Sequence, residues 1–386
     1  MDNALRQLIT ISKTVGKDSR LVQGVGGNTS VKTNDEKYMY IKASGTALKD
    51  MNNRRGWRRL RTQVVRDIFK DKSLSGLAVD KREREMVNRL LSACDDEQGR
   101  TVRPSVESTL HVVLGKCVIH LHALAALAYG CAKNGKEQID EIFSDQKYPP
   151  LWVRYADPGF SLGRKVCRLV GGYEKGFGAK PSIMFLQNHG LIISTDEPDE
   201  ALKLLKKVIS RCNAHLKPLA KTVVKKASPI EVKNVKLNIK KALLEISGRQ
   251  VTVRHFAEPV VLGFSERKDA EQLLKAPALT PDEMGFVKSP AIWLDKYDYK
   301  TISVKVAFAL RKTQNSPVAF LAEGLGLFIA AEPKLTNIIK NLVAGSLFIR
   351  ANAKELGGIT ALDRRQRQFI KNWESETFRI NKAQNE

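Results

Sequence analysis

Residues 103–122 read RPSVESTLHVVLGKCVIHLH, and this stretch decides how we expect the chain to fold. Its last part, CVIHLH, is rich in β-branched and aliphatic residues, which is typical of a strand. Residues i and i+2 of a strand lie on the same face, so His120 and His122 would present two imidazole rings side by side. A third histidine, His189, lies downstream in LQNHG (186–190), where Gly190 would permit a tight reversal that aims His189 inward.

Three imidazole nitrogens with an open fourth position are the ligand set of a catalytic zinc site. Glu107 precedes His111 by four residues, so the two would share one face of a helix. Glu107 could then be a fourth metal ligand or a base beside the metal. The alternative is that His120 and His122 are hydrogen-bonded residues of a half-buried strand, because the HxH pattern alone has low specificity.

A glycine-rich segment, GVGGNTS (24–30), follows an amphipathic helix that we predict over residues 3–15. Its glycines let the backbone approach a ligand closely, and Asn28, Thr29 and Ser30 add polar side chains. The same composition is compatible with a plain hairpin turn. Residues 30–44 are predicted to form a β-hairpin with its turn at Asn34–Asp35.

Five short motifs carry a resemblance to a known family: GVGGNTSVK (24–32), IKASGTAL (41–48), RPSVE with His111, HLHA (120–123) and NHG (188–190). In this order, over about residues 5–215, they resemble the class II aldolase/adducin family. The resemblance implies an α/β (α+β) fold, in which helices flank a central β-sheet. It also implies a zinc-dependent sugar-phosphate aldolase, although the family includes epimerases, dehydratases and the metal-free adducin head domain.

The resemblance also assigns roles to individual residues. It implies that one Zn²⁺ ion, or another divalent metal, is held by His120, His122, His189 and Glu107. Glu107 would in addition be the catalytic acid/base, and His111 would support the site without binding metal. The residues that match the family's phosphate-binding positions are Gly27, Asn28, Ser44, Gly45 and Ser105.

Two departures and one gap accompany this match. Some family members have a second serine where this chain has Val106, so one phosphate donor is missing. Many members have threonine where this chain has Ser44, and a hydroxyl is kept. The family also uses a tyrosine from an adjacent subunit of a tetramer as proton donor, and no motif places it among the eight tyrosines.

The composition is that of an ordinary globular protein, apart from its charge. No run of ~18 apolar residues and no signal-peptide core are present, and the five cysteines are scattered without a CxxC. We therefore expect a cytoplasmic protein with reduced thiols and no membrane contact. The net charge is +24, and RRGWRRLR (54–61) is the densest basic cluster. No nucleic-acid-binding signature accompanies it, so we interpret it as a solvated basic surface.

The length of 386 residues fits two domains. We predict a class II aldolase-like domain over 1–220, a basic linker over 221–245 and a smaller C-terminal α/β domain over 246–386. Motifs at 279–294, 319–332 and 369–380 resemble the region that follows the aldolase part of rhamnulose-1-phosphate aldolase/dehydrogenase fusions. The C-terminal piece has no GxGxxG, so no nucleotide site is predicted there.

The sequence therefore favours a zinc-dependent aldolase that cleaves a (deoxy)ketose 1-phosphate of the rhamnulose or fuculose type into dihydroxyacetone phosphate and an aldehyde. An epimerase or a dehydratase at the same metal is the first alternative. A non-catalytic, adducin-like interaction protein is the second, and nucleic-acid binding through the basic runs is the third.

Overall fold

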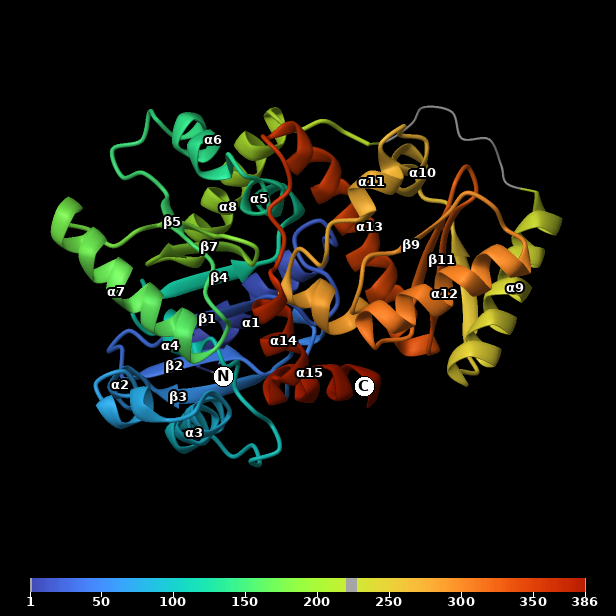
Figure 1. The fold of residues 1–386 in the computed structure, drawn as a ribbon. Helices are drawn as coiled ribbons and strands as arrows, with labels where there is room; N and C mark the ends of the chain where they lie inside the picture. The colour runs from blue at the N-terminus through green and yellow to red at the C-terminus, as the bar shows by residue number, and fades with distance from the viewer. Residues whose placement is uncertain (1, 220–227, 386) are drawn as a thin grey trace. The chain divides into compact units, whose positions relative to one another are not determined.

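The computed structural model describes residues 2–219 and 228–385 (Figure 1). These residues form two compact units that interleave along the chain. The first unit contains Met1–Gly130, Gly135–His215 and Asn372–Glu386. The second contains Cys131–Asn134 and Leu216–Lys371. The fold is mixed α/β, as the sequence predicts, with a large sheet in the first unit and a smaller sheet in the second.

The first unit is built on a seven-stranded sheet with the order β3-β2-β1-β4-β7-β6-β5 (Figure 1). Neighbouring strands are antiparallel except β5 and β6, which are parallel. The predicted hairpin is confirmed by the pairing of β1 with β2. The strands are β1 (Asn28–Lys32), β2 (Tyr38–Lys42), β3 (Trp57–Arg61), β4 (Cys117–Leu121), β5 (Leu151–Val153), β6 (Ile183–Leu186) and β7 (Gly190–Thr195).

Helices cover both faces of this sheet. Helices α1, α5 and α8 pack on one face, and the Ser12 hydroxyl of α1 lies 2.6 Å from the Thr29 hydroxyl of β1. The other face packs against α2, α3 and α7 through two clusters of buried apolar residues. The bounds are α1 (Asn3–Gly16), α2 (Thr62–Asp67), α3 (Val79–Ala93), α4 (Ser108–His111), α5 (Leu124–Gly130), α6 (Gly135–Ile142), α7 (Phe160–Phe177) and α8 (Pro198–Ala214).

The register of the central strands positions two of the predicted site residues, Asn28 and His120. Strand β4 lies between β1 and β7, and Asn28 of β1 pairs directly with His120 of β4. Paired residues of neighbouring strands point to the same face, so Asn28 and His120 project together. That face is the one covered by α7 and by the segment leading to α4.

The second unit is built on a four-stranded sheet with the order β8-β11-β10-β9. Helices α9 and α12 share a core with this sheet, in which Val235, Ile302 and Phe328 are fully buried. The strands are β8 (Thr252–Phe256), β9 (Ile292–Leu294), β10 (Ala319–Ala322) and β11 (Gly326–Ala331). The helices are α9 (Pro229–Ser247), α10 (Pro259–Ser265), α11 (Ala270–Leu274), α12 (Tyr299–Thr313), α13 (Pro333–Glu355) and α14 (Arg364–Asn372).

The predicted linker differs from the structure in an informative way. Residues 221–227 of that stretch lie outside the described residues, but the remainder forms α9, so the linker prediction is wrong there. Lys233, Lys240 and Lys241 are exposed on α9, whereas Val235, Ile239 and Leu243 recur at helical spacing on its buried face. The lysine content concealed this apolar stripe.

The chain after the second unit returns to the first one. Helix α15 (Glu374–Asn385) belongs to the first unit, although the sequence assigns these residues to the C-terminal domain. Within the described residues, no helix combines the length and apolar character that crossing a membrane would need.

Candidate functional site

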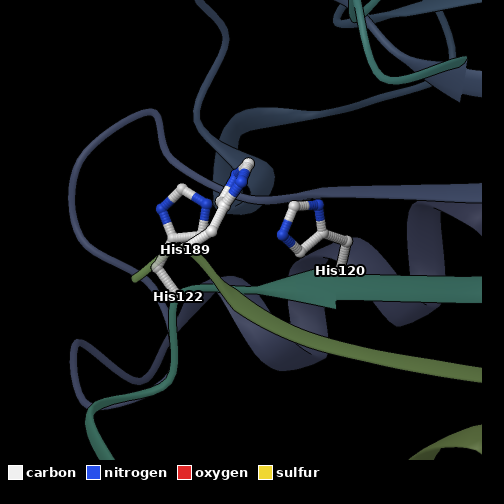
Figure 2. A group of neighbouring side chains, drawn as sticks. All are labelled: His120, His122 and His189. Carbon is white, nitrogen blue, oxygen red and sulfur yellow. The ribbon is translucent and has the colours of Figure 1, made fainter. Parts of the chain in front are cut away.

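Three histidines meet at the end of the central strands (Figure 2). His120 lies in β4, His122 lies just beyond it, and His189 lies in the turn between β6 and β7. Their ring centroids are 5.0 to 5.3 Å apart, and one nitrogen from each ring lies within 4.8 Å of the others. All three side chains are buried. The strand spacing that predicted a shared face for His120 and His122 is consistent with this geometry.

The β6–β7 turn works differently from the prediction. Asn188, with φ at 55°, is the turn residue that adopts the left-handed conformation, which asparagine tolerates better than most residues. Gly190 instead provides space. A Cβ atom there would lie 2.5 Å from the carbonyl oxygen of Leu121 and 3.0 Å from Nε2 of His120. The glycine therefore lets the turn approach β4 closely enough for His189 to join the other two rings.

Glu107 lies beside the three histidines. Its Oε2 is 2.9 Å from Nδ1 of His120, and its Oε1 is 3.1 Å from Nε2 of His189. The side-chain amide of Asn28 donates a hydrogen bond of 2.6 Å to Oε2 of Glu107. The carboxylate thus contacts two imidazole rings and a fixed amide donor inside a buried centre.

The surroundings of Glu107 favour its charged form. Burial alone would raise the pKa of Glu107, but the charge interactions and hydrogen bonds with His120 and His189 outweigh burial and hold this pKa well below its usual value. Burial, together with repulsion from His120, lowers the pKa of His111 to about 3. The site therefore holds an ionised carboxylate, and His111 stays neutral beneath it.

Three alternate residues of β1 secure the segment that carries Glu107. Asn28 bonds to Glu107, the hydroxyl of Ser30 lies 2.8 Å from Nδ1 of His111, and Nζ of Lys32 donates to the carbonyl oxygen of Leu114 at 2.6 Å. Residues 28, 30 and 32 share one face because side chains alternate along a strand. His111 is therefore linked to β1 through Ser30. Helix α4 covers only Ser108–His111, so Glu107 precedes it instead of lying within it as predicted.

The residues that match phosphate-binding positions fall into two groups. The backbone N–H of Ser44 donates to the carbonyl of Arg103, and the N–H of Ser105 donates to the carbonyl of Lys42. These bonds bring Ser44, Gly45 and Ser105 to one edge of the site. Asn28 is directed toward Glu107 instead, and Gly27 precedes it on the glycine-rich loop.

Lys42 and Arg103 are two residues near this edge that the sequence did not single out. The ammonium group of Lys42 donates to the carbonyl oxygens of Val25 and Gly27, each at 2.7 Å, and so fixes the shape of the glycine-rich loop. A lysine inside a strand of otherwise apolar and aromatic residues was the available signal. The guanidinium of Arg103 is oriented by Glu374 of α15, which no local pattern could reveal.

The residues of the centre fit a divalent metal ion. Three imidazoles and one carboxylate are the donor types that zinc prefers when it serves in catalysis. Nε2 of His120 and Nδ1 of His189 are buried and have no hydrogen-bond partner among the described residues. Burying such nitrogens costs free energy unless a ligand satisfies them, and a cation would do so.

The fold and this centre together define an α/β domain with a buried three-histidine site. The sequence profile described as the class II aldolase and adducin N-terminal domain matches residues 6–216. This match covers more than half of the 386 residues, so the chain belongs to the class II aldolase/adducin family. The resemblance seen in the short motifs is confirmed.

Parts of this chain are similar to known proteins and to solved structures. YuxG of Bacillus subtilis strain 168, described as an uncharacterized oxidoreductase, is 27% identical over 200 residues, which are 50% of this chain and 26% of that protein. The N-terminal class II aldolase domain of a conserved Thermoplasma acidophilum protein is 27% identical, with coverages of 55% and 94% and a TM-score of 0.45. An l-fuculose-1-phosphate aldolase from Thermus thermophilus is 16% identical, with coverages of 54% and 92% and a TM-score of 0.32. This chain thus spans about a quarter of YuxG.

Proposed function

We propose that this protein is a metal-dependent aldolase that cleaves a (deoxy)ketose 1-phosphate of the rhamnulose or fuculose type into dihydroxyacetone phosphate and an aldehyde. The observation that carries the proposal is the buried centre in which Glu107 contacts His120 and His189. Family membership alone also allows an epimerase, a dehydratase or an adducin-like interaction protein. A scaffold needs no converging ligands, and three buried imidazoles beside an ionised carboxylate favour catalysis.

In this proposal His120, His122 and His189 hold a zinc ion, and Glu107 is placed to complete or flank the ligand set. A divalent ion bound there supplies positive charge that offsets the negative charge developing on the ketone oxygen. Neutral imidazole ligands leave the charge of such an ion undiminished. The hydrogen bond from Asn28 keeps the Glu107 carboxylate oriented toward the same space.

Glu107 is the proposed proton carrier of the reaction. Cleavage removes a proton from the C4 hydroxyl and breaks the C3–C4 bond, whose electron pair forms an enediolate. C3 then takes a proton to give dihydroxyacetone phosphate. In the reverse direction the ionised carboxylate of Glu107 accepts that proton from C3 as a general base.

The phosphate group of the substrate is proposed to bind at the edge formed by Ser44, Gly45 and Ser105, with Gly27 and Asn28 on the adjoining loop. Binding energy from this non-reacting group would orient the reacting carbons against Glu107. We further propose a homo-oligomer, by resemblance a tetramer, that works in the cytoplasm. The described part of the chain contains five free thiols, consistent with a reducing compartment.

Metal content and turnover test the proposal together. We expect about one zinc per chain by elemental mass spectrometry, and dihydroxyacetone phosphate from a 1-phosphoketose in an assay coupled to a reductase. His189→Ala should lose both. His215→Ala is the matched control, because His215 is exposed at the end of α8, and should keep both. Stoichiometric zinc in His189→Ala would refute the ligand assignment. A protein that binds zinc but cleaves no ketose phosphate would refute the proposal that it is an aldolase.

A further inference from the structure

The sheet of the second unit repeats the part of the first sheet that carries the histidines. In the first unit, β5 and β6 are parallel, α7 connects them, and β7 follows as the antiparallel partner of β6. In the second unit, β9, α12, β10 and β11 have the same arrangement. A strand from earlier in the chain, β4 or β8, pairs antiparallel with the last strand of each set. The strand order β4-β7-β6-β5 therefore corresponds to β8-β11-β10-β9.

The strand register also agrees between the two units. The pairs of β6 with β7 match the pairs of β10 with β11 one for one, from Ile183–Ile193 and Ala319–Ile329 at one end to Leu186–Gly190 and Ala322–Gly326 at the other. Ile192 and Phe328 each lie two positions after the matched glycine. Ile192 pairs with His120 in β4, and Phe328 pairs with His255 in β8. His255 thus has the position of His120.

Gly326 approaches β8 as Gly190 approaches β4. A Cβ atom at Gly326 would lie 2.5 Å from a backbone carbonyl oxygen of β8 and 3.3 Å from Nε2 of His255. These are the counterparts of the two atoms that a Cβ atom at Gly190 would meet first. The third residue within reach is Ala257 beside Gly326 and His122 beside Gly190. Ala257 thus has the position of His122.

The β10–β11 turn has the conformation of the β6–β7 turn. Gly324 has a φ of 67°, and Asn188, at the same place in the first turn, has a φ of 55°. The backbone N–H of Leu325 donates a 3.1 Å hydrogen bond to the carbonyl three residues earlier, and the N–H of His189 does the same at 3.1 Å. Leu325 thus has the position of His189.

The second unit therefore keeps one of the three histidine positions. Ala257 and Leu325 offer no side-chain nitrogen, and Leu325 belongs to the apolar core that the sheet shares with α9 and α12. Nε2 of His255 lies 2.8 Å from the carbonyl oxygen of Leu325. A carbonyl oxygen only accepts hydrogen bonds, so this nitrogen carries a hydrogen and has no free lone pair for a metal.

We propose that the second unit is a copy of the metal-binding half of the first unit, and that the residues at positions 257 and 325 have abolished its metal site. This inference rests on the proposed function only for the ligand set of the first unit. The four-stranded sheet has no counterpart of β1, which supplies Asn28. The repeat begins at β4 and so also excludes Glu107. A metal bound in the second unit would lack these two partners, so one catalytic metal per chain is expected.

The Ala257→His/Leu325→His variant of the full-length protein tests the inference by metal content. After incubation with zinc and dialysis, we expect about two zinc ions per chain by elemental mass spectrometry, against about one in the wild type. Adding His255→Ala should return the content to that of the wild type, because the new pair needs the third ring. Adding His189→Ala instead should remove only the ion of the first unit.

The reverse exchange provides a second test that leaves the core of the second unit intact. His122→Ala/His189→Leu gives the first unit the residues of the second. The metal-free variant should withstand denaturant at least as well as the metal-free wild type, because buried nitrogens without partners are replaced by apolar groups. His122→Leu/His189→Ala is the matched control, since it has the same composition in the wrong positions. It should unfold at a lower denaturant concentration.

The outcomes separate this inference from the aldolase proposal. A folded Ala257→His/Leu325→His variant with the zinc content of the wild type overturns the inference, even if the protein cleaves ketose phosphates. Extra zinc that persists after His255→Ala overturns it as well. If that variant does not fold, the reverse exchange decides, and no advantage over its control counts against the copy. A wild type without zinc refutes the ligand set of the first unit, whereas extra zinc in the variant would still support the copy.

Discussion

Because Gly190 has no side chain, the β6–β7 turn can approach β4 closely enough for the three histidine rings to meet. Because an added methyl group would meet backbone oxygen of Leu121 and a ring nitrogen of His120, we expect Gly190→Ala to lower the free energy of unfolding by about 1–3 kcal/mol. Zinc affinity should fall about 10–100-fold, as when the support of a metal ligand is disturbed. A competition titration with a zinc chelator measures this change.

Gly171→Ala is the control for this variant. Nothing lies within 4 Å of a Cβ atom at Gly171, which is part of α7. Alanine in a helix interior is favoured over glycine by roughly 0.5–1 kcal/mol, so this variant should be slightly more stable and bind zinc normally. If Gly190→Ala binds zinc as tightly as Gly171→Ala, the close approach of the turn to β4 has no role in the site.

Replacing Glu107 should separate metal binding from proton transfer. We expect Glu107→Gln to keep zinc on the three histidines and to lower kcat by about 10²–10⁴-fold, the range for loss of a general acid/base. The amide can still accept the hydrogen bond that Asn28 now donates. Stopped-flow or coupled assays measure the rate, with the exposed Glu97→Gln as control. An active Glu107→Gln enzyme would place the proton carrier elsewhere.

Residue patterns predicted the cluster of three histidines better than the contacts that support it. The HxH spacing works because strand side chains alternate, and His189 follows from a motif at a turn. The contact between Asn28 and Glu107 joins residues 79 positions apart, and no local pattern encodes such a distance. The sequence predicts that Gly190 forms the reversal, whereas Asn188 adopts the left-handed conformation and Gly190 allows close packing. A sequence shows which residues permit a turn but not which atoms they approach.

At the scale of elements, Glu83 joins helix α3 to the start of α7. Its Oε2 accepts a hydrogen bond of 3.2 Å from the backbone N–H of Phe160, and the side chain is 5% exposed. Burial is the main cause that raises the pKa of Glu83 to about 7, against 4.5 in an unfolded chain. The folded state therefore holds this proton more tightly than the unfolded state.

The sign of the pH dependence follows from linkage. Between pH 4.5 and 7 the folded protein binds more protons at Glu83, so the contribution of Glu83 to stability is largest below pH 4.5 and falls as pH rises toward 7. The difference amounts to at most about 3 kcal/mol. Denaturant titrations at several pH values measure the free energy of unfolding. In the Glu83→Gln variant, this free energy should no longer fall between pH 4.5 and 7 because of residue 83. Equal pH dependence in both proteins would mean that Glu83 is ionised in the folded state.

Local patterns identified elements where amphipathicity was clear. Helix α1 and the β1–β2 hairpin match their predictions because apolar residues recur at helical or alternating spacing. Helix α4 is shorter than predicted because the chain bends at Ser105, whose carbonyl and hydroxyl bond to Ser108 and to Glu107. Such competition between side chains and backbone is decided by the packed structure.

At the scale of the molecule, residues 372–386 complete the first unit. Trp373 is 7% exposed and packs near Gly159, where an added Cβ would lie 3.1 Å from its ring. Removing a buried aromatic side chain costs about 3–5 kcal/mol, so we expect Trp373→Ala to destabilise the first unit by about 3 kcal/mol. The equilibrium denaturation midpoint, read by tryptophan fluorescence and circular dichroism, measures it.

Phe308→Ala controls for the loss of an aromatic residue. Phe308 is 60% exposed on α12, so its removal should change stability by less than about 0.5 kcal/mol. Equal effects of the two substitutions would show that α15 is not anchored by Trp373. The attachment of α15 was not predictable, because FIKNWESETFRI (369–380) is an ordinary amphipathic pattern whose partner is distant in sequence.

The interleaving of the two units has a consequence for protein synthesis. The second segment of the first unit ends at His215, and its third segment begins at Asn372. At roughly 5–20 residues per second, a ribosome needs on the order of 10–30 s to make the intervening residues. During that interval, the surface of the first unit that later contacts Trp373 and α15 stays exposed. A chain that is cut short within the second unit would keep His120, His122 and His189 but lack Trp373 and α15, so its first unit should be less stable than that of the full chain.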